Sequence, residues 1–217
     1  AASRANTVAA EPERPDSVEG QGRGSAPMKA LLPRLAVLEL EGAILQDSPE
    51  RTAGPPFRWV QGAVRDCMGV EVKIQPGLPE LLLESEWAEE DAECQLAVLS
   101  RTTRPEWAQQ ILETYETESG ATLWELVRFF SVIPGLGPSQ PASETLRAVM
   151  ASSTIQSLSK AAEVAYEDMI FFGKEMRVCR HLGAMGVTSI RTPYGVSPEV
   201  WHEGLELHAT LLAEQRQ

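Results

Sequence analysis

With 217 residues, the chain is long enough for one α/β domain with extensions, and a hydrophobic content of 43% can supply a sizeable core. The formal net charge of −12 and the pI of about 4.8 argue against nucleic acid or an anionic membrane as the main partner, because phosphate binding needs clustered Lys and Arg. No apolar run approaches the ~18 residues that a membrane span needs, so we expect no membrane span and a soluble protein.

Residues 1–28 differ in composition from the rest of the chain, with almost no large apolar side chain. Such a segment cannot bury enough surface to offset the entropy of ordering, so we expect a low-complexity tail at 1–28 and a folded domain over 29–217. A long tail is typical of segments that wrap around a neighbouring protein. The Ala-rich start without Met suits an imported protein of a plastid or mitochondrion, with the cytoplasm as the alternative. Three widely spaced cysteines without a CxxC pair indicate free thiols in a reducing compartment.

The first predicted strand is an apolar run at 35–38, and the acidic residues Glu39 and Glu41 follow at its carboxyl end. Residues 46–75 are rich in Pro and Gly and predict a loop or a short hairpin insertion. An amphipathic helix is then expected over 76–83, opened by Pro and Gly.

A second short buried strand is predicted over 95–99 and ends in Ser100-Arg101-Thr102. Residues 103–106 resemble a capping box with Pro in the first turn, and the helix that follows carries apolar side chains at helical spacing. Residues 121–133 are another apolar segment, and the pattern from 143 to about 164 is helical.

A third buried strand is predicted over 168–172 and ends in Gly173-Lys174-Glu175. A helix over 176–185, a strand over 187–190 and a final helix with Ser197 as its N-cap complete the chain. Strands that alternate with helices predict an α/β fold with a parallel sheet and helices on both faces. In such sheets the functional site lies at the carboxyl ends of the strands.

The three strand ends and the segment Phe171 to Thr188 also carry a resemblance to known proteins. In their order and placement, the chain resembles the haloacid dehalogenase (HAD) superfamily, and within it the magnesium-dependent phosphatase type 1 family, over most of residues 31–210. The resemblance implies a Rossmann-like HAD fold with a minimal cap.

The same resemblance gives the first two strand ends their roles. The family's nucleophilic, magnesium-binding Asp corresponds to Glu39 here, and its general acid/base Asp corresponds to Glu41. The Ser or Thr that holds the phosphoryl group in the family is kept as Ser100. Arg101 and Thr102, which follow it, are the candidate substrate-binding residues.

Two further family groups are missing from this sequence. The Lys that stabilises the aspartyl-phosphate has no counterpart between 141 and 145, where Glu144 is the expected occupant. The Asp pair that holds magnesium in the family is replaced by Gly173 and Lys174. We therefore predict no metal site, with Mg²⁺ as a cofactor only if activity survives. One hypothesis is that the Lys174 ammonium replaces the metal beside Glu39, and the alternative is a Lys174 side chain turned to solvent.

The departures from the family's site favour a catalytically degenerate homologue. A longer acid moves the carboxylate by more than ~1 Å, and a misplacement of that size can cost about 10²-fold in rate. The leading expectation is thus a structural or interaction subunit of a larger assembly, with protein partners. The alternative is an active or weakly active magnesium-dependent phosphatase that uses Glu39. A third reading is a binder of a small molecule or a phosphoprotein, with Arg101 and Lys174 facing the anion.

Overall fold

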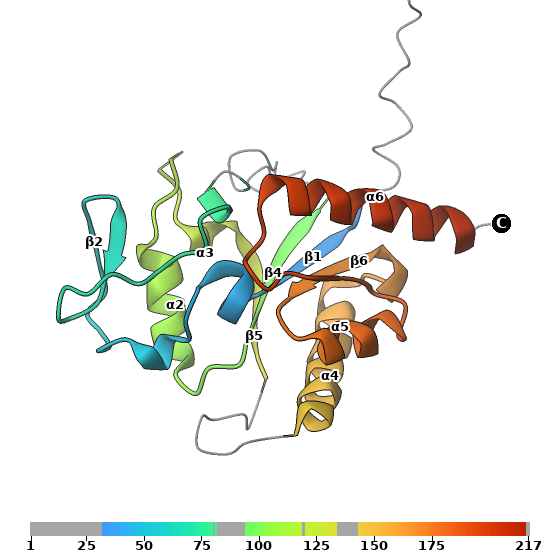
Figure 1. The fold of residues 1–217 in the computed structure, drawn as a ribbon, viewed down its shortest axis with the longest axis horizontal. Helices are drawn as coiled ribbons and strands as arrows, with labels where there is room; N and C mark the ends of the chain where they lie inside the picture. Colours follow the sequence, from blue (N-terminus) through green and yellow to red (C-terminus); the bar gives the residue numbers. More distant parts are fainter. Residues whose placement is uncertain (1–31, 80, 82–93, 119, 134–142, 216–217) are drawn as a thin grey trace, which may run out of the picture.

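The computed structural model describes residues 32–79, 81, 94–118, 120–133 and 143–215 of the chain (Figure 1). The tail predicted at 1–28 lies outside the described residues, as do positions 80, 82 and 83 of the helix predicted over 76–83, in which positions 78, 79 and 81 are helical. In the described part of the chain, no helix combines the length and the apolar character needed to cross a bilayer.

Five parallel strands form the central sheet in the order β5-β4-β1-β6-β7. They are β1 (Leu35–Glu39), β4 (Gln95–Ser100), β5 (Val127–Val132), β6 (Met169–Gly173) and β7 (Thr188–Arg191). Strand β1 lies in the middle, where Leu35 is paired with Gln95 on one side and with Met169 on the other. All five of its side chains are buried, and the first four are one continuous apolar run that ends at Glu39.

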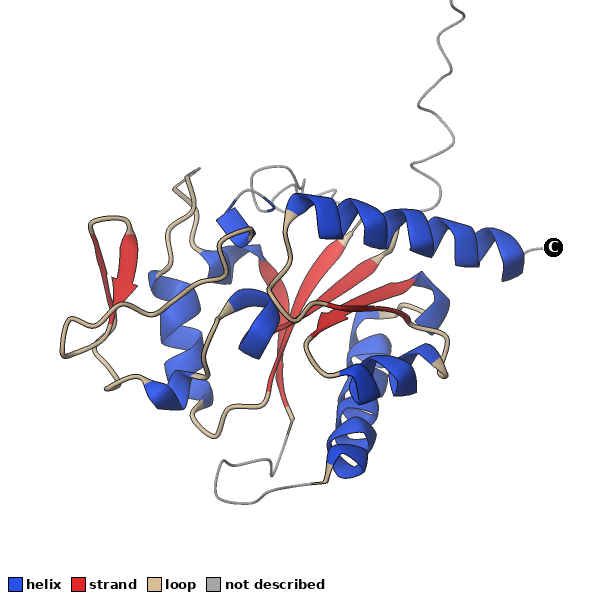
Figure 2. Cartoon of the chain, in the orientation of Figure 1, coloured by secondary structure: helices blue, strands red, loops and turns tan. Residues whose placement is uncertain are grey.

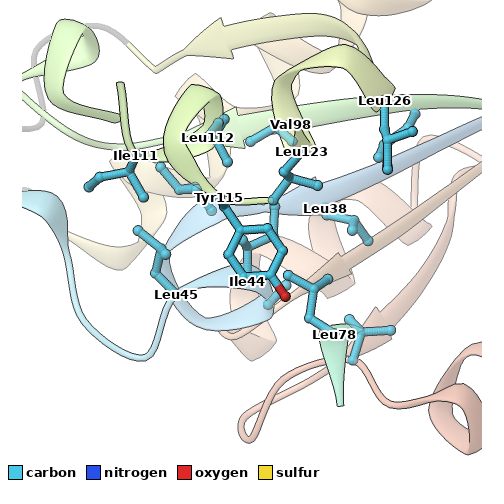
Figure 3. Packing of buried hydrophobic residues seen from close by; sticks show 14 of the residues in the cluster. Leu38, Ile44, Leu45, Leu78, Val98, Ile111, Leu112, Tyr115, Leu123 and Leu126 are labelled. Carbon is cyan, nitrogen blue, oxygen red and sulfur yellow. The ribbon is translucent and has the colours of Figure 1, made fainter. Parts of the chain in front are cut away.

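Helices cover both faces of the sheet, as predicted (Figure 2). They are α2 (Pro105–Thr114), α3 (Leu123–Leu126), α4 (Glu144–Ala162), α5 (Met176–Gly183) and α6 (Pro198–Gln215). Successive side chains of a strand point to opposite faces, so β1 serves two hydrophobic clusters. Leu38 packs with α2, α3 and α6 in the first cluster, part of which Figure 3 shows, and Val37 packs with α4 and α5 in the second.

The chain leaves β1 through a tight turn, η2 (Leu40–Ile44), in which Gly42 has a φ of +117°. The 3₁₀ turn η3 (Pro49–Arg51) and an antiparallel hairpin of β2 (Arg58–Val60) and β3 (Ala63–Arg65) follow. This hairpin is the insertion predicted over 46–75. A second 3₁₀ turn, η4 (Tyr166–Asp168), leads into β6.

The structure differs from the sequence prediction at two elements. The predicted capping box does not form, because Arg104 is the N-cap of α2 and its side chain makes no capping hydrogen bond. The Arg104 N–H instead donates to Thr102 Oγ1 at 2.9 Å. The apolar segment 121–133 contains the capped helix α3 and the edge strand β5, which the pattern did not separate. At α6, the Val200 N–H lies 3.4 Å from Ser197 Oγ, in agreement with the predicted N-cap.

Candidate functional site

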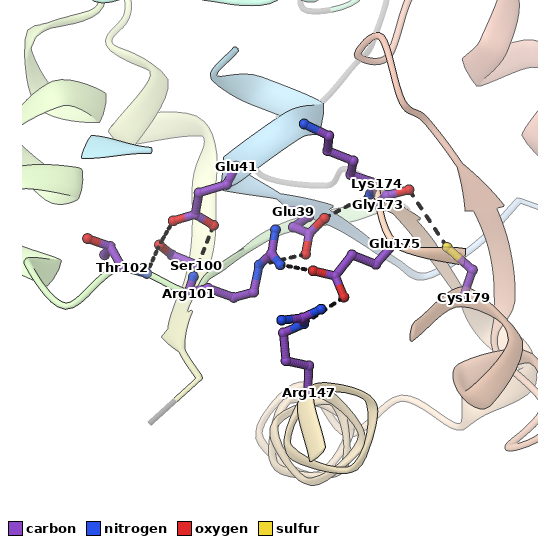
Figure 4. A network of polar contacts seen from close by, with 10 residues as sticks. All are labelled: Glu39, Glu41, Ser100, Arg101, Thr102, Arg147, Gly173, Lys174, Glu175 and Cys179. Carbon is purple, nitrogen blue, oxygen red and sulfur yellow. Dashed lines mark hydrogen bonds and ion pairs between the residues drawn. The ribbon is translucent and has the colours of Figure 1, made fainter. Parts of the chain in front are cut away.

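Polar side chains from three neighbouring strand ends converge at the carboxyl edge of the sheet (Figure 4). Glu39 is the last residue of β1, Ser100 is the last residue of β4, and Gly173 is the last residue of β6. Because β1 lies between β4 and β6, the three predicted strand ends are brought together in one cluster. We call it the strand-end network: Glu39, Glu41, Ser100, Arg101, Arg147 and Glu175.

Glu39 is 1% exposed, and both of its carboxylate oxygens face polar partners. Its Oε2 accepts the Lys174 N–H at 2.8 Å, and its Oε1 lies 3.1 Å from Arg101 Nε as an ion pair without hydrogen-bond alignment. Burial raises the pKa of Glu39 from 4.5 to about 7, against the lowering effects of the Arg101 charge and the Lys174 N–H. Burial therefore outweighs the ion pair at this carboxyl.

Glu41 is buried as well, and its two oxygens are held by the end of β4. The Ser100 hydroxyl donates to Oε1 at 2.6 Å and the Arg101 N–H donates to Oε2 at 3.0 Å. Burial raises the pKa of Glu41, and these two hydrogen bonds oppose the rise. Gly42, with its positive φ, turns the chain directly after Glu41. The Glu41 side chain therefore faces Ser100 at the end of the neighbouring strand.

Arg101 is the centre of the strand-end network. Its backbone N–H binds Glu41, its Nε faces Glu39, and its Nη1 pairs with Glu175 Oε1. The other oxygen of Glu175 pairs with Arg147 Nε at 3.0 Å. A single guanidinium thus joins carboxylates from β1 and from the start of α5.

Two members of this network were not predicted as site residues. Glu175 directly follows the third strand end, so its position in the sequence was a usable signal. Arg147 lies in the first turns of α4 and reaches Glu175 across 28 positions of sequence, which no local pattern indicates. Glu144, predicted at the family's Lys position, instead pairs with the exposed Arg177 at 3.3 Å.

The ion pair predicted for the Lys174 ammonium is not formed. Lys174 is exposed, its side chain runs away from Glu39, and no carboxylate oxygen of the described residues lies within 4.0 Å of its Nζ (Figure 4). Its stem packs over Gly42, where an added Cβ would lie 3.0 Å from Lys174 Cβ. Arg101 has taken the pairing with Glu39, because its guanidinium reaches into the cluster from β4.

Thr102, a candidate substrate-binding residue, contacts Glu50 of η3. The Thr102 hydroxyl donates to Glu50 Oε1 at 2.6 Å, and Thr103 donates to the same oxygen. Against burial, which raises it, hydrogen bonds from Ser48, Thr102 and Thr103 lower the pKa of Glu50 to about 2. These contacts tie the insertion to the end of β4.

The residues around the strand ends do not fit a magnesium ion. Mg²⁺ demands near-octahedral oxygen ligands at 2.0–2.1 Å, whereas a guanidinium lies between Glu39 and Glu175. A side chain at Gly173 has no room, because its Cβ would lie 2.5 Å from the Phe171 ring and 3.2 Å from Glu39 Oε2. In the part of the chain that the structure describes, no group of three His, Cys, Asp or Glu could hold a metal ion.

Comparison with known proteins identifies the family. A sequence model of the acid phosphatase family matches residues 31–210, which is most of the chain. The chain belongs to the acid phosphatase family. A human member, magnesium-dependent phosphatase 1, is 28% identical over 184 residues, which are 83% of this chain and 89% of that protein. The resemblance to HAD proteins of the magnesium-dependent phosphatase type is therefore confirmed.

Similar solved structures also come from phosphatases. The D,D-heptose 1,7-bisphosphate phosphatase of B. bronchiseptica, complexed with magnesium and phosphate, gives a TM-score of 0.49 at 14% identity over 83% of this chain and 99% of that one. A phosphatase domain from Bacteroides fragilis, complexed with Mg, gives 0.48 at 14% identity over 83% of this chain and 42% of that one. This member of the acid phosphatase family has Glu39 and Glu41 at its first strand end.

Proposed function

We propose that this chain is a catalytically inactive member of the acid phosphatase family that serves as a structural or interaction subunit. The observation that carries the proposal is the position of the Glu41 carboxylate. It accepts the Ser100 hydroxyl and the Arg101 N–H, which are two of the donors that the end of β4 could offer to an anion. An internal carboxylate thus occupies the place where a phosphoryl group would be held.

Glu39 is poorly placed to act as a nucleophile. Attack on phosphorus requires a free carboxylate oxygen about 3–3.5 Å from the phosphorus atom. Both oxygens of Glu39 already face donors, and the side chain is buried beneath Arg101. A phosphate ester at this edge would also meet Glu41 and Glu175, whose negative charges repel it.

The human relative is named a magnesium-dependent phosphatase. The strand-end network of this chain supplies no fitting site for that ion. Electrostatic stabilisation of a transferring phosphoryl group is a large part of such catalysis. Arg101 and Arg147 are each engaged by Glu175, and the exposed Lys174 side chain runs away from Glu39. This arrangement supports a site whose charges satisfy one another rather than a substrate.

Turnover of p-nitrophenyl phosphate tests the proposal. We expect the wild-type chain with excess Mg²⁺ to match the rate without protein and to match the variant Glu39→Ala. Glu71→Ala, which removes a largely exposed carboxylate of the hairpin region, is the matched control. Metal-dependent turnover that Glu39→Ala abolishes and Glu71→Ala preserves would establish an active phosphatase instead.

The subunit role rests on the closed site and on the tail at 1–28, which lies outside the described residues. We propose that the tail binds a partner protein and that the native particle contains more than this chain. The mass of the native particle, measured by light scattering after gentle isolation, should exceed 23.7 kDa clearly. A native particle of that mass, together with tight binding of a phosphopeptide, would favour the binder over the subunit.

A further inference from the structure

Three carboxylates with little access to water contact one residue, Arg101, at the end of the sheet. Glu39 and Glu41 are buried, and the Glu175 side chain is 21% exposed. Carboxylates placed this close together away from water require a compensating cation. The Arg101 guanidinium, with its side chain 19% exposed, pairs with Glu39 and Glu175, and the Arg101 backbone N–H donates to Glu41.

We propose that Arg101 is the resident cation of this site, and that it holds the place that a divalent cation would otherwise occupy between Glu39 and Glu175. The inference deepens the proposed function and rests on it, because a site with its own tethered cation has no need of magnesium. The planar guanidinium presents Nε to one carboxylate and Nη1 to the other. The side chain of Arg101, which directly follows β4, thus joins the end of β1 to the start of α5.

Neighbouring cations do not share this position. Lys174 is exposed, and only its backbone N–H contacts Glu39. Arg147 pairs with Glu175 Oε2, on the side away from Arg101. In the described residues, Arg101 is therefore the cation that bridges the two strand ends.

Removal of the guanidinium has a defined consequence. The oxygens Glu39 Oε1 and Glu175 Oε1, which now face Arg101, would be left without a cation in a partly dry space. Hard carboxylate oxygens are the ligands that Mg²⁺ and Mn²⁺ prefer. Arg101→Ala should therefore uncover a divalent-cation site that the wild-type chain does not have.

Thermal unfolding with and without Mg²⁺ or Mn²⁺, near pH 8, tests the inference. Arg101→Ala should lower the Tm by about 5–10 °C without metal, because Glu39 loses its ion pair and Glu175 keeps only the one with Arg147. A saturating divalent cation should restore about 5–10 °C. The matched control is Arg177→Ala, which removes an exposed guanidinium paired with Glu144 and should show neither effect. The wild-type Tm should change by less than about 1 °C with metal.

The metal response must depend on the two carboxylates. Adding Glu175→Gln to Arg101→Ala should abolish the restoration. Metal stabilisation of the wild-type chain, or no metal response of a folded Arg101→Ala chain, would overturn the inference. If Arg101→Ala does not fold without metal, the readout is its refolding yield with and without Mn²⁺, measured in parallel for Arg101→Gln. Failure of Mn²⁺ to recover either folded variant would count against the inference. These readouts involve no turnover, so phosphatase activity of the wild-type chain would end the proposed function separately.

Discussion

Glu39 should make the stability of this protein fall as the pH rises. Its carboxyl has an ordinary pKa of 4.5 in the unfolded chain and a pKa of about 7 in the folded one, with burial as the main cause. The folded state therefore binds a proton more tightly than the unfolded state. The stabilisation is fully present below pH 4.5 and is lost as the pH rises through about 7.

The size of the effect follows from the same values. A rise from 4.5 to about 7 corresponds to about 3 kcal/mol of unfolding free energy. About 2 kcal/mol of this falls between roughly pH 5.5 and 8, a range that avoids the isoelectric region. Glu39→Gln keeps an oxygen to accept the Lys174 N–H but cannot titrate.

The assay is urea unfolding of wild type and Glu39→Gln across that pH range, followed by Trp fluorescence. The difference in unfolding free energy between them should shift by about 2 kcal/mol in favour of the variant as the pH rises. The control Glu71→Gln, at a largely exposed carboxylate, should keep a constant difference from wild type. A shift of opposite sign for Glu39→Gln would mean that the Arg101 charge outweighs burial and would refute the reasoning.

Two further variants test the packing of the fold. Gly173→Ala should cost about 1–3 kcal/mol in urea unfolding, because its Cβ would lie 2.5 Å from the Phe171 ring. Gly183→Ala, where a Cβ meets nothing within 4 Å, should be neutral or stabilising, and an equal cost at both sites would contradict the steric argument. Burial lowers the pKa of His208, whose Nδ1 lies 2.8 Å from Thr188 Oγ1, so the contribution of His208 to stability should fall as the pH drops below 6.5, opposite in sign to that of Glu39. The difference in unfolding free energy between wild type and His208→Gln should therefore shift in favour of the variant between about pH 7 and 5.5, and a constant difference would exclude this contribution.

The sheet was predictable because its strands are buried on both faces. A central parallel strand is buried on both faces, so β1 and β6 stand out as short apolar runs that stop at Glu39 and at Gly173. The edge strand β5 was not predicted as a strand, because it is not fully buried on both faces. Its side chains are mostly half-buried and include the exposed Arg128, so its pattern resembles an ordinary apolar segment.

The site was predictable in position and less so in its contacts. Strand order places Glu39, Ser100 and Gly173 together, and the sequence pattern gave those strand ends correctly. The identity of the cation that pairs with Glu39 depends on how far each side chain reaches across the sheet. Lys174 was predicted as this partner, and Arg101 is the partner observed. Arg101 was predicted to bind substrate, whereas its long charged side chain binds Glu39 and Glu175 instead.

A crystal structure of the wild-type chain grown in excess Mg²⁺ and phosphate would show whether Arg101 or a metal ion lies between the carboxylates. We expect the Arg101 guanidinium between Glu39 and Glu175, with the Glu41 carboxylate on the Ser100 hydroxyl and no ordered phosphate beside it. An octahedral Mg²⁺ bound to Glu39, with Arg101 turned away and phosphate on Ser100, would contradict it.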